Sequence, residues 1–225
     1  SIDILFVSRV VPHKGHKHII TISDIIKKFI KVDVNFHIVG STEGRMKKYS
    51  TFLEVESRKL GINLKFHWLL SEEDLHSAYK NSDVFMCMSE HEGFGMPAFE
   101  AMRCGIPIVS WANTAFSDLL INHPFSNETY NPYWFAAATI FAVTSRENFY
   151  KIGEIQNEIL ETYNKHVVEK QLINSMSNNN YNIESKRNKR YGLINEEIRK
   201  IEKSIKENVN DIELYEFDSS KNHFS

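Results

Sequence analysis

Residues 83–103 read DVFMCMSEHEGFGMPAFEAMR, and this stretch decides the fold. The apolar run from Asp83 to Met88 has the length of a buried strand. A turn with two glycines, Gly93 and Gly95, comes next, and a short helical pattern then runs from Pro97 to Arg103. Proline suits the first turn of a helix, because its missing N–H would have no partner there. A strand, a glycine-containing turn and a helix in this order predict one βα unit.

The same alternation continues on both sides of this stretch. Four further strands are expected at residues 4–7, 34–39, 64–69 and 106–110, separated by helical patterns at 19–30, 45–60 and 71–80. Short apolar strands that alternate with helices predict a doubly wound α/β domain with a parallel sheet and right-handed crossovers. Further helical patterns at 132–143 and 146–168 are expected to cover that sheet.

The composition of the 225 residues excludes several classes of protein. Hydrophobic residues make up 42% and charged residues 25%, which is typical of a globular chain. Lys and Arg number 27 against 29 Asp and Glu, so no basic excess points to nucleic acid as a partner. No apolar run is long enough to cross a membrane, and no signal sequence opens the chain.

Two features bear on where the protein works. Cys87 and Cys104 lie in apolar surroundings and are too few for a disulfide framework, so we interpret both as reduced core residues of a cytoplasmic protein. Ser1 leads directly into the first core strand, which predicts a piece of a longer protein. The missing part is where we expect any peripheral contact with a membrane.

A change of composition near Ser177 predicts a domain at residues 1–176 and a polar linker with a helical tail at 177–225. The tail has isoleucines at helical spacing between Glu and Lys residues, which predicts an amphipathic helix. Two interpretations stay open for this helix, a solvated tail that frays or a surface that docks on a missing partner. The isoleucines are Ile194, Ile198, Ile201, Ile205 and Ile212.

Two stretches with reactive or charged side chains follow strands at the same edge of the predicted sheet. Arg9, Lys14 and Gly15 follow the first strand, and residues 89–100 follow the strand at 83–88. In doubly wound folds, ligands bind at the carboxyl ends of the strands. Both stretches also lead into helix N-termini, where free backbone amides attract an anion such as phosphate. We therefore expect a binding site formed by these two stretches.

The charged residues of this site suit a nucleotide that carries a sugar. Glu92 and Glu100 are placed to face one cavity, and a carboxylate accepts two hydroxyl hydrogen bonds, as a ribose or hexose diol requires. Arg9 and Lys14 are able to neutralise a pyrophosphate. The sequence contains no Asp-x-Asp pair for a divalent ion, so we expect neither a metal nor another cofactor.

Each of these residues also has a plainer interpretation. Glu92 and Glu100 would favour a helix N-terminus without any ligand, and Arg9 and Lys14 would form a solvated edge. His91 is either a phosphate contact or an exposed loop residue.

The remaining histidines and the tryptophans are weighed in the same way. His13, His16 and His18 are interpreted as a surface cluster rather than a metal site, because they straddle a loop and a helix start. Trp68 and Trp111 are interpreted as packing residues rather than stacking platforms. No Ser-His-Asp or Cys-His arrangement can be argued from the spacing.

Together these motifs resemble the C-terminal, donor-binding domain of family 4 (group 1) glycosyltransferases of the GT-B fold. The resemblance covers about residues 2–176 and implies a Rossmann-like half of that fold with a C-terminal helical extension. It rests on the two stretches above and on further segments at 36–40, 71–75, 83–85 and 105–109.

The resemblance implies a retaining, metal-independent hexosyltransferase of polysaccharide or glycoconjugate biosynthesis, with a nucleotide-sugar as donor. It implies that Glu100 holds the ribose diol and Glu92 the transferred sugar, while Arg9 and Lys14 stabilise the leaving diphosphate. The other residues implied to line the donor are Gly15, His91, Gly93, Phe94, Gly95 and Met96.

Two segments depart from the family pattern. Trp68 stands where the family usually has glycine near the base, and residues 114–118 stand where it usually has Gly-Gly-x-Pro-Glu. These departures and the amphipathic tail motivate an alternative, a non-catalytic glycosyltransferase-like subunit that supports a partner chain. An epimerase or phosphorylase on the same fold is disfavoured, because its reactive residues are not recognisable. Since a GT-B acceptor lies between two domains, this chain without its N-terminal acceptor-binding half is expected to bind donor but transfer poorly.

Overall fold

The computed structural model describes residues 1–41, 47–120, 123–144, 146–163 and 189–212. At its centre is a six-stranded sheet in the order β3-β2-β1-β4-β5-β6, and every neighbouring pair of strands is parallel. This arrangement confirms the predicted doubly wound α/β fold. The strands are β1 (Ile2–Val7), β2 (Val34–Gly40), β3 (Asn63–Trp68), β4 (Val84–Cys87), β5 (Ile108–Trp111) and β6 (Ser126–Asn127).

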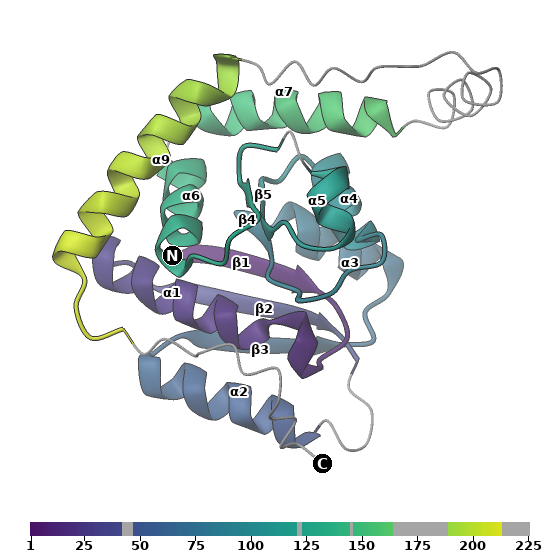
Figure 1. The fold of residues 1–225 in the computed structure, drawn as a ribbon. Helices are drawn as coiled ribbons and strands as arrows, with labels where there is room; N and C mark the ends of the chain where they lie inside the picture. Colours follow the sequence, from purple (N-terminus) through teal and green to yellow (C-terminus); the bar gives the residue numbers. More distant parts are fainter. Residues whose placement is uncertain (42–46, 121–122, 145, 164–188, 213–225) are drawn as a thin grey trace.

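Helices cover both faces of the sheet, as right-handed crossovers require. On one face lie α1 (His16–Ile30), α2 (Lys47–Leu60) and α6 (Pro132–Thr144), and on the other lie α3 (Glu72–Lys80) and α4 (Met96–Arg103) (Figure 1). A further helix, α7 (Arg146–Thr162), packs along α4 and α6.

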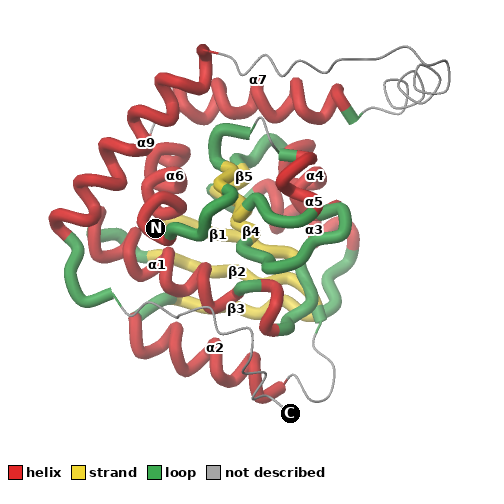
Figure 2. Tube along the Cα trace, in the orientation of Figure 1, coloured by secondary structure: helices red, strands yellow, loops and turns green. Residues whose placement is uncertain are grey.

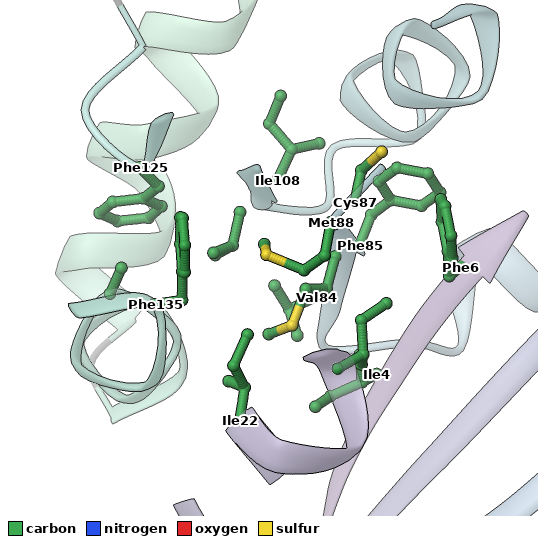
Figure 3. Packing of buried hydrophobic residues seen from close by; sticks show 14 of the residues in the cluster. Ile4, Phe6, Ile22, Val84, Phe85, Cys87, Met88, Ile108, Phe125 and Phe135 are labelled. Carbon is green, nitrogen blue, oxygen red and sulfur yellow. The ribbon is translucent and has the colours of Figure 1, made fainter. Parts of the chain in front are cut away.

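The central strands are apolar because both of their faces are covered. All four residues of β4 are buried, and Ile4 and Phe6 of β1 are almost completely buried. Helical side chains complete this core, among them Ile22 of α1 and Phe135 of α6 on one face (Figure 3), and Met102 of α4 on the other. The edge strand β3 is more polar and more exposed.

The order of the strands reverses between β1 and β4. From β1 the chain continues to β2 and β3 on one side, whereas from β4 it continues to β5 on the other. The two chain segments leave these neighbouring strands in opposite directions, which opens a crevice at the carboxyl edge of the sheet. Because the loops at 8–15 and 88–95 follow β1 and β4, they lie side by side at this crevice.

Three short elements were not expected from the sequence. They are a 3₁₀ turn, η1 (Pro12–Lys14), the helix α5 (Ala115–Leu119) and the two-residue strand β6. Each is too short to show a period in its apolar residues, so no pattern predicts it. The first residues of the helix expected from Arg45, and the last ones of that expected to Val168, lie outside the described residues.

The predicted amphipathic helix is α9 (Lys189–Asn208), and both interpretations of it are wrong. It lies across α6 and also contacts α1 (Figure 2), and Ile194, Ile198 and Ile205 are buried there. Its apolar face is therefore covered by this chain's own domain. The boundary predicted near Ser177 lies outside the described residues.

Candidate functional site

The two loops at the crevice are joined through their backbones. The N–H of Glu90 donates a hydrogen bond to the carbonyl oxygen of His13, with 2.8 Å between N and O. Gly15 has a φ of 71° and packs so closely on Met88 that a side chain would overlap the Met88 carbonyl group. Glycine is therefore required here by the contact between the loops. The structure thus brings together the two stretches that the sequence singled out.

The first charged pair of the site is formed by Lys14 and Glu92. The ammonium Nζ of Lys14 lies 2.7 Å from Oε1 of Glu92, and the side chains are only 15% and 12% exposed. The hydroxyl of Ser89 donates to the same carboxylate oxygen, also at 2.7 Å. Within the part of the chain that the structure describes, Oε2 of Glu92 has no hydrogen-bond partner. One oxygen is thus held by two donors, and the other has no described partner.

Glu100, one turn inside α4, is held in the same manner. Its Oε2 accepts a hydrogen bond from the hydroxyl of Tyr79 on α3 at 2.8 Å. Burial, and then this hydrogen bond, raise the pKa of Tyr79 well above its usual range, so the hydroxyl stays a donor. Among the described residues, Oε1 of Glu100 has no hydrogen-bond partner.

Positive charge gathers beside these carboxylates. Arg9 is exposed, and its guanidinium forms no hydrogen bond or ion pair with a described residue. Burial, followed by the charges of Lys14 and Arg9, lowers the pKa of His13, which places these groups within electrostatic reach of one another. His91 is exposed, and its carbonyl oxygen accepts a hydrogen bond from Lys14 at 3.4 Å.

The turn before α4 contains two glycines, of which Gly93 is open to solvent and Gly95 is packed against a side chain. A side chain added at Gly93 would meet nothing, whereas at Gly95, with a φ of 73°, it would overlap the ring of Phe116. The backbone N–H groups of residues 93–96 make no hydrogen bond to any residue that the structure describes. Phe94 and Met96 are about half exposed. The backbone here is therefore available to an anion or to a sugar hydroxyl.

A model of the family described as glycosyl transferases group 1 matches residues 1–155, which include every residue of this site. The chain belongs to this family.

Individual relatives agree with the family model. An uncharacterized glycosyltransferase of Methanocaldococcus jannaschii is 33% identical over 109 residues, which cover 47% of this chain and 26% of the relative. Mannosylfructose-phosphate synthase of Agrobacterium fabrum is 28% identical over 111 residues, which cover 47% of this chain and 24% of the enzyme. The matched part of the chain therefore spans about a quarter of the length of these curated relatives.

Solved structures show that the fold is shared. The C-terminal domain of a glycosyl transferase group 1 family protein from Francisella tularensis superimposes with a TM-score of 0.63 and 20% identity, covering 72% of this chain and 85% of that one. HepE of Anabaena, in complex with UDP and glucose, superimposes with a TM-score of 0.64 and 20% identity, covering 79% and 48%. The fold of this group 1 glycosyl transferase chain is that of one Rossmann-like half of a GT-B enzyme.

The histidines of this group 1 chain differ from the expected surface cluster. His16 and His18 are buried, and only His13 is exposed. The first turn of α1 faces the sheet, so the ring of His16 packs against Phe6 and lies 3.0 Å from the Ser8 hydroxyl. Across the described ranges, no group of three or more His, Cys, Asp or Glu side chains is arranged to hold a metal ion.

Other side chains singled out in the sequence are placed as follows. Trp68 is 42% exposed and stacks on Phe66, and Trp111 packs against Tyr130 while its indole N–H donates to a backbone carbonyl group. Cys87 is buried as predicted, but Cys104 is partly exposed, because it lies at the end of α4. None of the helices in the described ranges is both long and apolar enough to cross a membrane.

Sequence reasoning missed three side chains that help to hold the two glutamates, those of Ser89, Tyr79 and Thr114. Ser89 lies three residues before Glu92 and gave a local signal that was not used. Tyr79 reaches Glu100 from another helix, so no local pattern connects the two residues. Thr114 lies in a segment noted only as a departure from the family, yet its hydroxyl contacts the backbone of Glu92.

Proposed function

We propose that this chain binds the nucleotide-sugar donor of a retaining, metal-independent glycosyltransferase in the crevice between the loops at 8–15 and 88–95. The observation that carries the proposal is the state of the two glutamates. Glu92 and Glu100 are each fixed through one oxygen by a neighbouring donor, and each keeps a second oxygen without a described partner. Oxygens held in this way are preorganised to accept hydroxyl groups.

The diphosphate of the donor belongs beside Lys14 and Arg9. The guanidinium of Arg9 has two parallel donors that suit phosphate oxygens. Lys14, on the same loop, supplies a second positive charge. The free amides of residues 93–96 add further donors from the opposite side of the crevice. With these donors in place, the proposed site binds the diphosphate without a divalent ion.

The sugar groups of the donor belong to the glutamates. We assign the ribose diol to Glu100 and the transferred sugar to Glu92, in line with the family resemblance. The solved structure of HepE with UDP and glucose supports a nucleoside diphosphate and a hexose as the class of ligand, since HepE shares this fold.

The proposed reaction breaks the bond between the anomeric carbon of the sugar and the diphosphate oxygen. The leaving diphosphate keeps the electron pair, and the positive charges of Arg9 and Lys14 stabilise it as its charge grows. The oxygen of the acceptor hydroxyl then forms the new bond to the anomeric carbon, and its proton passes to the leaving diphosphate. The acceptor belongs on a second domain or partner chain, so this chain by itself is expected to bind donor and to transfer poorly. A cytoplasmic location stays a prediction.

Calorimetry of the purified chain against a panel of nucleoside diphosphates and their sugars, without divalent ions, tests the proposal. We expect one donor to bind with a micromolar to low-millimolar Kd. Lys14→Ala and Glu100→Gln should each weaken binding by about 10- to 150-fold, because each removes a charge-assisted contact of about 1.5–3 kcal/mol.

Two exposed residues serve as matched controls. Lys48→Ala on α2 and Glu73→Gln on α3 make the same chemical changes away from the crevice and should leave the Kd unchanged. Chelator should not change the Kd either. A folded chain that binds no donor, or one that binds only with a divalent ion, would contradict the proposal.

A further inference from the structure

We infer that Thr114 is a positioning residue that holds Glu92 and the loop around it in the geometry that binds the donor. This inference rests on the proposed function, because the loop is the one to which we assign the diphosphate and sugar. It concerns a residue at which this chain departs from the family pattern. The departure then strengthens the donor site instead of abolishing it.

The hydroxyl of Thr114 contacts both backbone groups of Glu92. The hydroxyl oxygen of Thr114 accepts a hydrogen bond from the backbone N–H of Glu92 at 2.9 Å and donates one to the backbone carbonyl of Glu92 at 3.1 Å. The N–H of Ala115 also points to this carbonyl, at 3.4 Å. Both backbone groups of Glu92 are thus fixed by the segment that follows β5.

The backbone of Thr114 has a conformation that is unusual for a threonine. Its φ of 47° and ψ of −126°, together with the hydrogen bond from the Phe116 N–H to the Asn113 carbonyl at 3.0 Å, match a type II′ turn. The first central position of that turn is usually glycine, and a β-branched residue is rare there. Glycine would adopt this backbone without strain but has no hydroxyl. The strained threonine is therefore explained by the two bonds to Glu92.

The neighbours of Thr114 also contact the loop that carries Glu92. The side-chain amide of Asn113 donates to the Ser89 carbonyl at 2.8 Å, and the Phe116 ring fills the space beside Gly95. Residues 113–116 therefore hold the loop at its start, at Glu92 and at its end. The amides of 93–96 stay free of described partners while the loop that carries them is fixed.

Three variants of Thr114 distinguish the effect of the hydroxyl from the effect of the strained backbone. Thr114→Ala keeps the strain and removes the hydroxyl, Thr114→Ser keeps the hydroxyl, and Thr114→Gly removes both. Thr129→Ala is the matched control, because Thr129 is exposed and its hydroxyl bonds to no described residue. Two quantities are measured for each, the donor Kd by calorimetry and the hydrogen-exchange rate of the Glu92 amide by NMR.

We expect Thr114→Ala and Thr114→Gly to raise the Kd and the exchange rate by about fivefold each, the equivalent of one net hydrogen bond. Thr114→Ser and Thr129→Ala should match the wild type in both. A wild-type Kd and exchange rate in Thr114→Ala would overturn the inference, as would a Thr114→Ser variant as impaired as Thr114→Ala. If the wild-type chain binds no donor, the proposed function fails, and faster Glu92 exchange in Thr114→Ala but not in Thr114→Ser still supports Thr114 as the residue that holds the loop.

Discussion

The carboxylates of Glu92 and Glu100 share one arrangement at the level of single atoms. In each, a neighbouring donor occupies one oxygen and orients the plane of the group, through Lys14 and Ser89 in one case and through Tyr79 in the other. A fixed carboxylate loses less conformational freedom when a ligand binds. We therefore expect Ser89 and Tyr79 to contribute to donor affinity without touching the ligand.

Tyr79→Phe tests this argument for Glu100. Removal of the hydroxyl should weaken binding of a ribonucleoside-diphosphate sugar by about fivefold, because Glu100 loses a hydrogen bond that orients it. The same variant should not weaken binding of the 2′,3′-dideoxyribose analogue, which lacks the diol assigned to Glu100. Calorimetry with both ligands measures the difference.

Tyr150→Phe is the matched control, since Tyr150 is 71% exposed on α7. It should leave both Kd values unchanged. Equal losses for both ligands in Tyr79→Phe would show that Tyr79 acts on the fold in general and not on the ribose.

At the scale of elements, the sequence predicts what is periodic and misses what is short. The apolar runs of β1 and β4 and the isoleucine stripe of α1 were found because burial on a sheet leaves a repeat in the sequence. The strand β6 and the turn at Thr114 leave none, since single backbone hydrogen bonds define them. The charged site residues were predicted from their chemistry and from their position after a strand. Tyr79 and Thr114 contact Glu100 and Glu92 from other elements, so no local pattern in the sequence predicted their roles.

Three histidines are buried in the core, and they make the free energy of unfolding depend on pH. Burial lowers the pKa of His16 to about 3 and that of His18 to about 4 in the first turn of α1. Burial also lowers the pKa of His123 to about 4, where its ring lies 3.1 Å from Oε1 of Gln156 on α7. In the unfolded chain all three have a pKa of about 6.5.

Below about pH 6.5 the unfolded state binds protons that the folded state does not bind, so acid favours unfolding. We expect the free energy of unfolding to fall by about 2 kcal/mol between pH 7 and pH 6 from these three residues. Urea unfolding at each pH measures the loss. His123→Gln should reduce this pH-dependent loss by about a third, whatever its effect at pH 7. A free energy of unfolding that stays constant from pH 7 to pH 5 would contradict the account.

At the scale of the whole molecule, α9 is the element whose place the sequence did not predict. The isoleucine spacing gave the helix and its apolar face, but the spacing carries no information about which surface covers that face. The answer depends on α6, a largely buried apolar helix that packs against α1 and α7 and also against α9. α9 thus joins the core of the α/β domain, and it should stabilise that domain directly.

Two variants test whether α9 stabilises the domain. Ile198→Ala and Leu193→Ala each truncate an aliphatic side chain of this helix to a methyl group. Ile198 is fully buried, so its truncation should lower the free energy of unfolding by about 3 kcal/mol. Leu193 is 71% exposed, so its truncation should change that free energy by less than about 0.5 kcal/mol. Urea unfolding followed by a core probe, such as the fluorescence of Trp111 or Trp134, measures both. Equal, small effects would mean that α9 adds nothing to the fold, whereas the expected difference means that the helix folds with the sheet as one unit.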